Sequence, residues 1–463
     1  MSGKTISEKI LSAKSGRDAR ARDIVVCDVD LVLGTDASSP MAIDYFEQMA
    51  GTALFDPARV LFAMDHYAPP ATPVVAAFHD RIRRFARTHG AEVREVGDGI
   101  SFQLAAELGR AVPGSLVIGA DSHTVTLGAL GLFATGVGSS DLAAAMITGQ
   151  VWLRVPETIH VTLDGERPPS VTAKDVALEL VRIVGPEGAN YQALELDGPA
   201  MSSFSLEERL VISNLGVEMG AKAAIFGVDA ETEAYLPGRL APSDHGRSMV
   251  VASDGDAPYA REIVVDVSTI SPRISLPHSP DNVVSIEEAV GTPVHMVFIG
   301  TCTGGRTGDF HDVLGVLDRA GGRIAPGVQL VLTPASREVE RRLLDDGTLD
   351  ALAAMGGIVT TPGCGACCGT SGVLPGDGMN VMSTANRNFK ARMGNATASI
   401  YLASPTACAA AAVTGRITDP RTLPGSITGR STSRVARAWW ATTSTRTTSS
   451  HRVANARRSM RRF

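Results

Sequence analysis

The sequence predicts an α/β fold, and two observations lead to this prediction. Short apolar runs that end in glycine or acidic residues alternate along the chain with longer segments of helical periodicity. Polar motifs follow directly after some of these runs, which is where α/β proteins usually place their sites. The clearest runs are IVVCDVD at 24–30, LVIG at 116–119 and VHMVFIG at 294–300.

Two breaks in this pattern divide the chain. Near Val155 an alanine-rich helical stretch gives way to the strand-like run 159–164. The segment 272–281 holds three prolines in ten residues, which disfavours regular structure and predicts an interdomain connection. Residues 171–235 are predicted to be helices around one domain. Since 463 residues are too many for one core, we expect α/β domains at 1–155, 156–285 and 286–427, and a tail at 428–463.

The composition argues against several classes of protein. Hydrophobic residues make up 44% and charged residues 20%, as in globular proteins, and no apolar run approaches the roughly 20 residues of a membrane span. The first residues lack the apolar segment of an export signal, so we expect a cytoplasmic protein. The last 36 residues hold nine arginines and no acid, so the net charge of the rest is −15 instead of −6. Neither a membrane nor a nucleic acid is therefore expected as a partner.

The cysteines give the strongest chemical signal. Cys364, Cys367 and Cys368 lie in the glycine-rich stretch GCGACCG at 363–369, and Cys302 lies in TCT at 301–303. This clustering is not typical of a disulfide framework. A C-x-x-C pair with a third thiolate from another loop gives three ligands and leaves one metal position open. From spacing alone, an iron-sulphur cluster, a zinc site and structural or redox thiols all remain possible.

Several stretches resemble the family of aconitases, homoaconitases and 3-isopropylmalate dehydratase large subunits. The most specific is GADSHTVTLGALG at 119–131, followed by GVGSSD at 136–141. The others are MDH at 64–66, NLGVEMGAK at 214–222, PHSPDN at 277–282, the cysteine motifs and STANRNFKAR at 383–392. The resemblance runs from Met1 to about Leu423, and KTISEKIL at 4–11 is typical of the isopropylmalate and homoaconitate branch. It implies an aconitase-like three-domain α/β/α architecture with a cluster between the domains.

The resemblance also implies a set of site residues. Cys302, Cys364 and Cys367 would hold a 4Fe-4S cluster whose fourth iron binds the substrate hydroxyl and a carboxylate. The implied catalytic residues are Asp65, His66, Asp121, His123 and Glu218, and the implied substrate-binding residues are Ser122, Asn386, Arg387 and Arg392. Loss of hydroxide from an unactivated carbon needs a polarised oxygen and a delivered proton, and imidazoles beside carboxylates suit that delivery. Guanidinium groups suit carboxylate binding.

The sequence departs from the family pattern at four positions. Family members usually have asparagine where Gly304 stands, which predicts looser cluster binding. They commonly have an active-site histidine where this chain has Phe102. Ala366 stands where proline is frequent, and Cys368 adds a thiol that either competes as a ligand or packs. The first two departures put catalysis in question.

The composition changes after Ile427, where Thr, Ser, Ala and Arg dominate. This predicts a basic disordered tail. A second hypothesis is a frameshift, in the gene or in its sequencing, because back-translation of 439–453 in a shifted frame permits a stretch that resembles the start of the family's small chain. An in-frame stop in the nucleotide sequence would contradict it.

The resemblance implies the large subunit of an iron-sulphur hydro-lyase acting on a small di- or tricarboxylic acid. The preferred activity is that of 3-isopropylmalate dehydratase, which isomerises 2- and 3-isopropylmalate in leucine biosynthesis. A small subunit is the expected partner, since the family's small chain supplies a swivelling domain with the catalytic base. The alternatives are a homoaconitase or other substituted-malate dehydratase, a catalytically impaired relative, and a zinc or thiol-redox protein.

Overall fold

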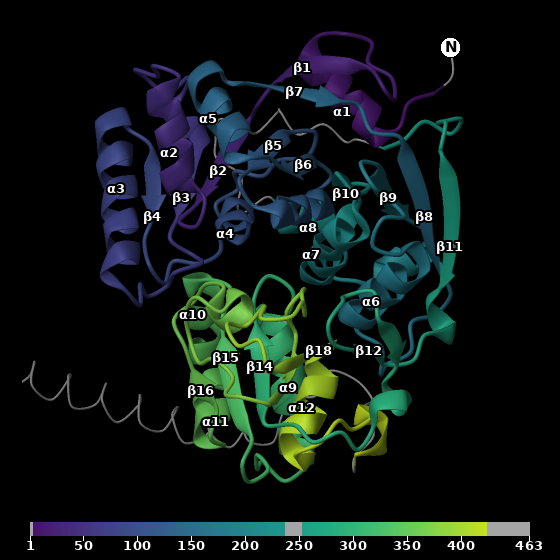
Figure 1. Cartoon of the computed structure of the whole chain (residues 1–463). Coiled ribbons are helices and arrows are strands. Elements are labelled where there is room, and N and C mark those ends of the chain that lie inside the picture. Colours follow the sequence, from purple (N-terminus) through teal and green to yellow (C-terminus); the bar gives the residue numbers. More distant parts are fainter. Residues whose placement is uncertain (1–2, 237–251, 424–463) are drawn as a thin grey trace, which may run out of the picture.

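The computed structural model describes residues 3–236 and 252–423, and their architecture confirms the predicted α/β class (Figure 1). Three sheets follow one another along the chain, and a two-stranded pair flanks the first of them. Figure 1 shows the third sheet and its helices, in green and yellow, facing the first two sheets, in blue and teal. The predicted tail at 428–463, and with it the frameshift hypothesis, lies outside the described residues.

The first sheet is parallel throughout and has the order β4-β3-β2-β5-β6. Its strands are β2 (Leu31–Thr35), β3 (Val60–Ala63), β4 (Glu92–Arg94), β5 (Leu116–Gly119) and β6 (Phe133–Gly136). Its helices are α2 (Ser39–Gln48), α3 (Pro73–His89), α4 (Ser101–Glu107) and α5 (Ser139–Thr148). Strands β2, β3 and β5 are buried along their whole length, as expected for parallel strands covered on both faces.

The N-terminal helix packs beside the two-stranded pair. Helix α1 (Ile6–Ser15) starts with a capping box between Thr5 and Glu8 and ends at Gly16 in the left-handed conformation. Strand β1 (Ile24–Asp28) pairs antiparallel with β7 (Gln150–Arg154), and alternate residues of both are exposed. The predicted run 24–30 is therefore a strand over its first five residues.

The second sheet is also parallel, with the order β10-β9-β8-β11. Its strands are β8 (Thr158–Asp164), β9 (Ala193–Asp197), β10 (Ala223–Phe226) and β11 (Arg261–Asp266), and its helices are α6 (Ala173–Val184), α7 (Leu206–Leu215) and α8 (Ala230–Tyr235). The prediction that 171–235 is helical is wrong at β9 and β10. Four- and five-residue buried strands carry no periodicity that separates them from a buried helix.

The third sheet has the order β13-β12-β18-β17-β14-β15-β16. Its strands are β12 (Arg273–Ser275), β13 (Val283–Ser285), β14 (Met296–Gly300), β15 (Gln329–Thr333), β16 (Ile358–Val359), β17 (Asn380–Ser383) and β18 (Ser399–Ala403). Its helices are α9 (Thr307–Arg319), α10 (Arg337–Asp345), α11 (Thr348–Ala354) and α12 (Pro405–Thr414). The proline-rich segment 272–281 is not wholly irregular, because β12 pairs antiparallel with both β13 and β18. The domain boundaries stay predictions, although β12 and β13 join the third sheet and precede the predicted boundary at 285.

The described part of the chain also contains short 3-10 helices. They are η1 (Pro57–Arg59), η2 (Ser122–Leu130), η3 (Pro199–Ser203), η4 (Gly216–Met219), η6 (Val267–Thr269), η7 (Ile286–Ala289), η8 (Gly365–Cys368) and η9 (Pro420–Thr422). Within residues 3–236 and 252–423, no helix has the length and the apolar character needed to cross a membrane.

The carboxyl ends of strands from the first and third sheets meet between the sheets. A backbone hydrogen bond of 2.9 Å from the N–H of Cys364 to the carbonyl of Asp65 joins their loops. Parallel sheets gather functional groups beyond these strand ends. The residues that follow the ends of β2, β3, β5, β14 and β17 are Asp36, Asp65, Asp121, Cys302 and Asn386.

Candidate active site

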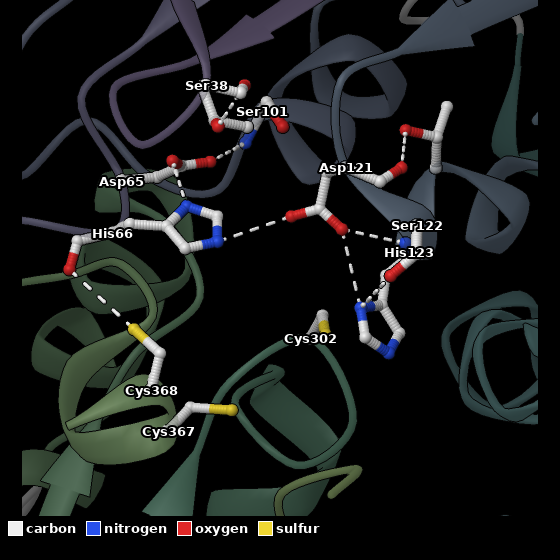
Figure 2. Close-up of polar contacts among 12 residues, drawn as sticks. Ser38, Asp65, His66, Ser101, Asp121, Ser122, His123, Cys302, Cys367 and Cys368 are labelled. Atoms are coloured by element: carbon white, nitrogen blue, oxygen red, sulfur yellow. Dashed lines mark hydrogen bonds and ion pairs between the residues drawn. The ribbon is translucent and has the colours of Figure 1, made fainter. Parts of the chain in front are cut away.

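His66 lies between two carboxylates. Its Nδ1 is 2.8 Å from Asp65 Oδ1, and its Nε2 is 3.3 Å from Asp121 Oδ2 (Figure 2). Asp65 Oδ2 also accepts a hydrogen bond of 2.9 Å from the backbone N–H of Ser101. Neighbouring side chains in a strand point apart, but β3 ends at Ala63, so Asp65 and His66 lie beyond it and pair directly.

The charges around His66 favour its protonated form. Burial by itself lowers the pKa of His66, but the negative charges of Cys364, Asp65 and Asp121 outweigh burial and raise this pKa well above its ordinary value. Burial raises the pKa of Asp121, yet hydrogen bonds from His123 and His66 bring it well below its usual range. A protonated imidazole held between carboxylates is a proton donor of fixed orientation.

Asp36 anchors the backbone of the His66 loop, and the sequence analysis did not assign it to the site. Its buried carboxylate accepts hydrogen bonds from the backbone N–H groups of His66 at 2.9 Å and Tyr67 at 3.0 Å, and lies 2.9 Å from His79 Nε2. Burial raises the pKa of Asp36, but the bond to His79 and the charge of His66 lower it below its usual value. Asp36 directly follows the apolar strand β2, and Asp65 comes soon after the apolar strand β3. This placement at a strand end is a sequence signal that could have identified Asp36.

His123 belongs to a second group of charges. Helix η2 begins after Asp121, whose Oδ1 accepts a hydrogen bond of 2.7 Å from the backbone N–H of His123. His123 Nε2 is 2.9 Å from Glu218 Oε1, which also accepts a hydrogen bond of 2.7 Å from Arg387 Nε. Arg387 in turn donates to Ser122 Oγ at 3.3 Å. Residues from all three sheet regions thus form one connected group.

Glu218 is buried, which suits the catalytic group to which the family resemblance assigns it. It lies in η4, directly after α7, with 8% of the residue exposed. Burial raises the pKa of Glu218, but His123 and Arg387 outweigh burial and lower it below its ordinary value. Glu218 therefore stays a carboxylate and fixes the direction of the Arg387 guanidinium, which suits recognition of a second carboxylate.

Three cysteines face these groups from loops of the third sheet. Cys302 follows β14, and Cys364 and Cys367 lie in the glycine-rich turn that contains η8. At Gly363 φ is 147°, and a Cβ atom would lie 2.9 Å from the carbonyl oxygen of Asp65, so glycine lets this turn approach the His66 loop. All six cysteines lie in the described residues, and none forms a disulfide.

Side-chain amides surround the sulphur atoms. Cys302 Sγ accepts hydrogen bonds from Asn214 Nδ2 at 3.1 Å and from Asn386 Nδ2 at 3.3 Å. The Oδ1 atom of the same Asn386 is 3.6 Å from Cys367 Sγ, and an Arg392 NH2 group donates to that sulphur at 3.9 Å. Asn386 therefore links two of the three thiols. Asn214 lies in the family-like stretch 214–222, and no role was predicted for it.

The thiol groups suit a metal centre. Burial raises the pKa of Cys302 to about 12 and the pKa of Cys364 well above its usual range. Burial disfavours the thiolate form of these cysteines, whereas a bound cation stabilises it. One ligand atom each from Asp65, His66 and Cys364 lie within 4.8 Å of one another. These residues form a candidate metal site.

The structure shows what surrounds each of the four residues that depart from the family pattern. Phe102 is 2% exposed and packs in an apolar cluster that includes Leu33, Ala335 and Cys302. A Cβ atom on Gly304 would lie 2.2 Å from the Cβ atom of Thr384, so a larger residue needs Thr384 to move.

The other two departures lie within η8. Ala366 is fully buried beside Cys367 in the core cluster that lies beneath this helix. Cys368 Sγ is 2.8 Å from Thr370 Oγ1, and Thr370 donates to the backbone carbonyl of His66. Both residues therefore belong to the turn that carries the candidate ligands Cys364 and Cys367.

The comparison with protein families identifies the chain. A model described as the aconitase family (aconitate hydratase) matches residues 8–293 and 290–415, which is most of the sequence. The chain belongs to the aconitase family. The aconitase-like fold expected from the sequence motifs is thereby confirmed.

Other members of the aconitase family match almost end to end. The 3-isopropylmalate dehydratase large subunit 2 of Archaeoglobus fulgidus is 45% identical over 422 residues, covering 90% of this chain and 99% of that protein. The 3-isopropylmalate dehydratase large subunit 1 of Methanopyrus kandleri is 41% identical, with the same coverage. The homoaconitase large subunit of Thermus thermophilus is 42% identical, covering 91% of this chain and 98% of that protein.

Proposed function

We propose that this chain is the large subunit of an iron-sulphur hydro-lyase, 3-isopropylmalate dehydratase. The reaction isomerises 2- and 3-isopropylmalate by dehydration to an unsaturated acid and rehydration. The single observation that supports it best is that Asn386 contacts both Cys302 and Cys367, while the thiol of Cys364 lies beside Asp65 and His66. Two relatives that are named 3-isopropylmalate dehydratase large subunits align with this chain along 99% of their own length.

The proposed cofactor is a 4Fe-4S cluster held by Cys302, Cys364 and Cys367. Amide donors to Cys302 and the guanidinium beside Cys367 fit anionic sulphur ligands. When bound, a cluster with three protein ligands supplies an open iron that acts as a Lewis acid on the substrate hydroxyl. A zinc site or redox thiols explain the three sulphur atoms equally well, but they leave the group of Glu218, Arg387 and Ser122 without a role.

His66 is the proposed proton donor of the dehydration. The pair of carboxylates at its two ring nitrogens holds a proton on the imidazole and fixes the direction of the ring. Transfer of that proton to the departing hydroxyl produces water and leaves His66 neutral between Asp65 and Asp121. The reverse transfer restores the proton when water adds to the double bond.

The carboxylates of the substrate are the proposed ligands of Arg387 and Arg392. Glu218 and Ser122 hold Arg387 in place, and His123 holds Glu218. A guanidinium fixed on one edge can bind a carboxylate through its other N–H groups. Asn386 aligns this segment with the thiols, because its amide contacts Cys302 and Cys367.

The proposed partner is a small subunit that completes the active site. The names of the relatives describe large subunits, so a second chain belongs to their enzymes. The base that removes the carbon-bound proton, and much of the selectivity for the substrate side chain, are assigned to that partner.

Anaerobic reconstitution with iron and sulphide, followed by addition of the small subunit, tests the proposed function. The chain should turn brown and bind stoichiometric iron, and ultraviolet absorbance of the unsaturated acid should appear with isopropylmalate. Turnover of homocitrate-type substrates in preference to isopropylmalate would favour the homoaconitase alternative. A colourless protein without iron would contradict the cluster.

A catalytically impaired relative is the second candidate, and Phe102 favours it. The ring occupies a buried apolar cluster next to Cys302, where family members commonly have an imidazole. In the reconstitution experiment, stoichiometric iron without turnover of any substituted malate would support this candidate over the dehydratase.

A further inference from the structure

Lys174 is a buried lysine that reaches from the second sheet region to the third. It lies in the first turn of α6, where Thr172 and Asp175 form a capping box, and only 2% of the residue is exposed. Its Nζ donates hydrogen bonds to the backbone carbonyls of Thr384 at 3.1 Å and Ala385 at 2.6 Å. No step of the proposed mechanism uses this side chain.

The two carbonyls that Lys174 contacts precede the residues that line the thiols. Asn386, whose amide donates to Cys302 Sγ, follows Ala385 directly. The carbonyl of Thr384 also accepts a hydrogen bond of 2.7 Å from Thr303 Oγ1, next to Cys302. The ammonium group of Lys174 therefore holds the backbone from which the asparagine and Arg387 extend.

The electrostatic surroundings of Lys174 involve the same thiols. Burial lowers the pKa of Lys174 to about 8, and negative charge on Cys302 and Cys367 opposes this change. Cys408 also lies near Lys174, but burial keeps the pKa of its thiol far above the ordinary value, and it is not a proposed ligand. A buried ammonium costs free energy unless negative charge lies near it. Thiolates that ligate a metal supply that charge permanently.

We propose that Lys174 is the buried counter-ion of the thiolate centre and the residue that positions Asn386 beside it. This inference rests on the proposed iron-sulphur function. Lys174 contacts neither the substrate nor the sulphur atoms, so it is a positioning residue and acts through charge and through the 384–386 backbone.

A fixed positive charge near a cluster has two measurable effects. It stabilises the more negative, reduced state, so its removal should lower the reduction potential. It also stabilises the thiolates, so its removal should weaken iron binding. Outer-shell partners of metal ligands typically change metal affinity about 10- to 100-fold, and we expect Lys174→Met to fall in this range.

The test uses the reconstituted chain, with Lys222→Met as the matched control. Lys222 is also largely buried, and its Nζ donates to the Gly136 carbonyl at 2.9 Å. Burial lowers the pKa of Lys222, and the charge that opposes this change is that of Asp141 and not of a thiolate. The measurements are the chelator concentration that removes half of the iron, and the reduction potential of the cluster. Lys174→Met should lose iron more readily and have a lower potential, whereas Lys222→Met should match the original chain in both.

Lys174→Arg separates the charge from general damage to the fold. It keeps the positive charge and should restore most of the potential, and thermal unfolding of the metal-free variants shows whether each one folds. If Lys174→Met does not fold, a potential unchanged in the folded Lys174→Gln variant would overturn the inference. So would equal effects of Lys174→Met and Lys222→Met. If the original chain binds no iron, it is the proposed function that fails.

Discussion

His66 and His123 each contact buried carboxylates, but the charges beyond those carboxylates differ. His66 lies between Asp65 and Asp121, and no guanidinium contacts either carboxylate in the described part of the chain. His123 lies between Asp121 at 3.3 Å and Glu218 at 2.9 Å, and the Glu218 carboxylate is shared with Arg387 at 2.7 Å. Both imidazoles therefore lie between two carboxylates and share Asp121. They differ because the second carboxylate of His123, Glu218, is also bound by a guanidinium, whereas the second carboxylate of His66, Asp65, is not.

This difference suits the two groups to different tasks. An imidazole between two carboxylates that no guanidinium neutralises holds a proton ready for transfer. A carboxylate between an imidazole and a guanidinium holds the guanidinium in one orientation, which suits the binding of an anionic substrate. One fold therefore obtains proton transfer and substrate recognition from the same residue types, because their neighbours differ.

The largest expected effect comes from removing the thiol that lies beside His66 and Asp65. Cys364→Ser should bind less iron and lose activity by about a thousandfold or more, since several kcal/mol of transition-state stabilisation by the metal disappear. Iron content and turnover with the small subunit measure this. Cys368→Ser is the matched control in the same turn and should keep its iron. Full turnover by the Cys364 variant would contradict the proposed centre.

The next largest effect distinguishes the two histidines. His66→Gln should lower kcat by about 10²- to 10⁴-fold, the usual contribution of a general acid, with a smaller change in KM. His123→Gln should act mainly on KM, because it releases the carboxylate that orients Arg387. Steady-state kinetics of both variants measure the separation. Equal losses of kcat in the two variants would refute the division of tasks.

Arg387→Lys gives a smaller effect within the second group. The ammonium keeps the charge but loses the planar N–H pattern that contacts Glu218 and Ser122. We expect KM to rise about tenfold, corresponding to loss of one charge-assisted hydrogen bond of about 1.5 kcal/mol, with kcat little changed. Isopropylmalate titrations at constant iron content measure it. A KM equal to that of the original chain would remove Arg387 from substrate recognition.

The smallest effect concerns Glu195, a buried carboxylate outside both groups. Its hydrogen-bond partners are the backbone N–H of Ser7 at 3.1 Å and the hydroxyl of Ser253 at 2.5 Å. Burial raises its pKa to about 7. The folded chain thus keeps a proton that the unfolded chain releases above its ordinary pKa, so the free energy of unfolding falls as pH rises from about 4.5 to 7.

Glu195→Gln should remove this pH dependence. Between about pH 5 and pH 8, the original chain should lose on the order of 1–3 kcal/mol more stability than the variant. Urea unfolding at the two pH values measures the difference. Parallel pH profiles would mean that Glu195 stays ionised at these pH values and would contradict the prediction.

The sequence predicted elements that have a strong local pattern and missed those that do not. The runs at 24–30, 116–119 and 294–300 contain strands because each combines apolar residues with a clear end signal. Strands β9 and β10 were missed because a run of four or five buried residues fits a helix equally well. Strand β12 was missed because the nearby prolines suggested an irregular connection.

The sequence by itself determined the family and the residue types of the candidate site, because catalytic motifs are short and local. The cysteine turn, the Asp-His pair at 65–66 and the Asp-x-His motif at 121–123 are each visible within a few residues. The roles assigned to them stay predictions.

Only the tertiary structure decided which groups meet. Asp121 contacts His66 as well as His123, Glu218 contacts a histidine 95 positions away, and Lys174 reaches carbonyls 210 and 211 positions away. These pairings depend on how strand ends and helices of separate sheet regions come together. That packing is set by burial summed over the whole chain, so no local stretch of sequence can reveal it.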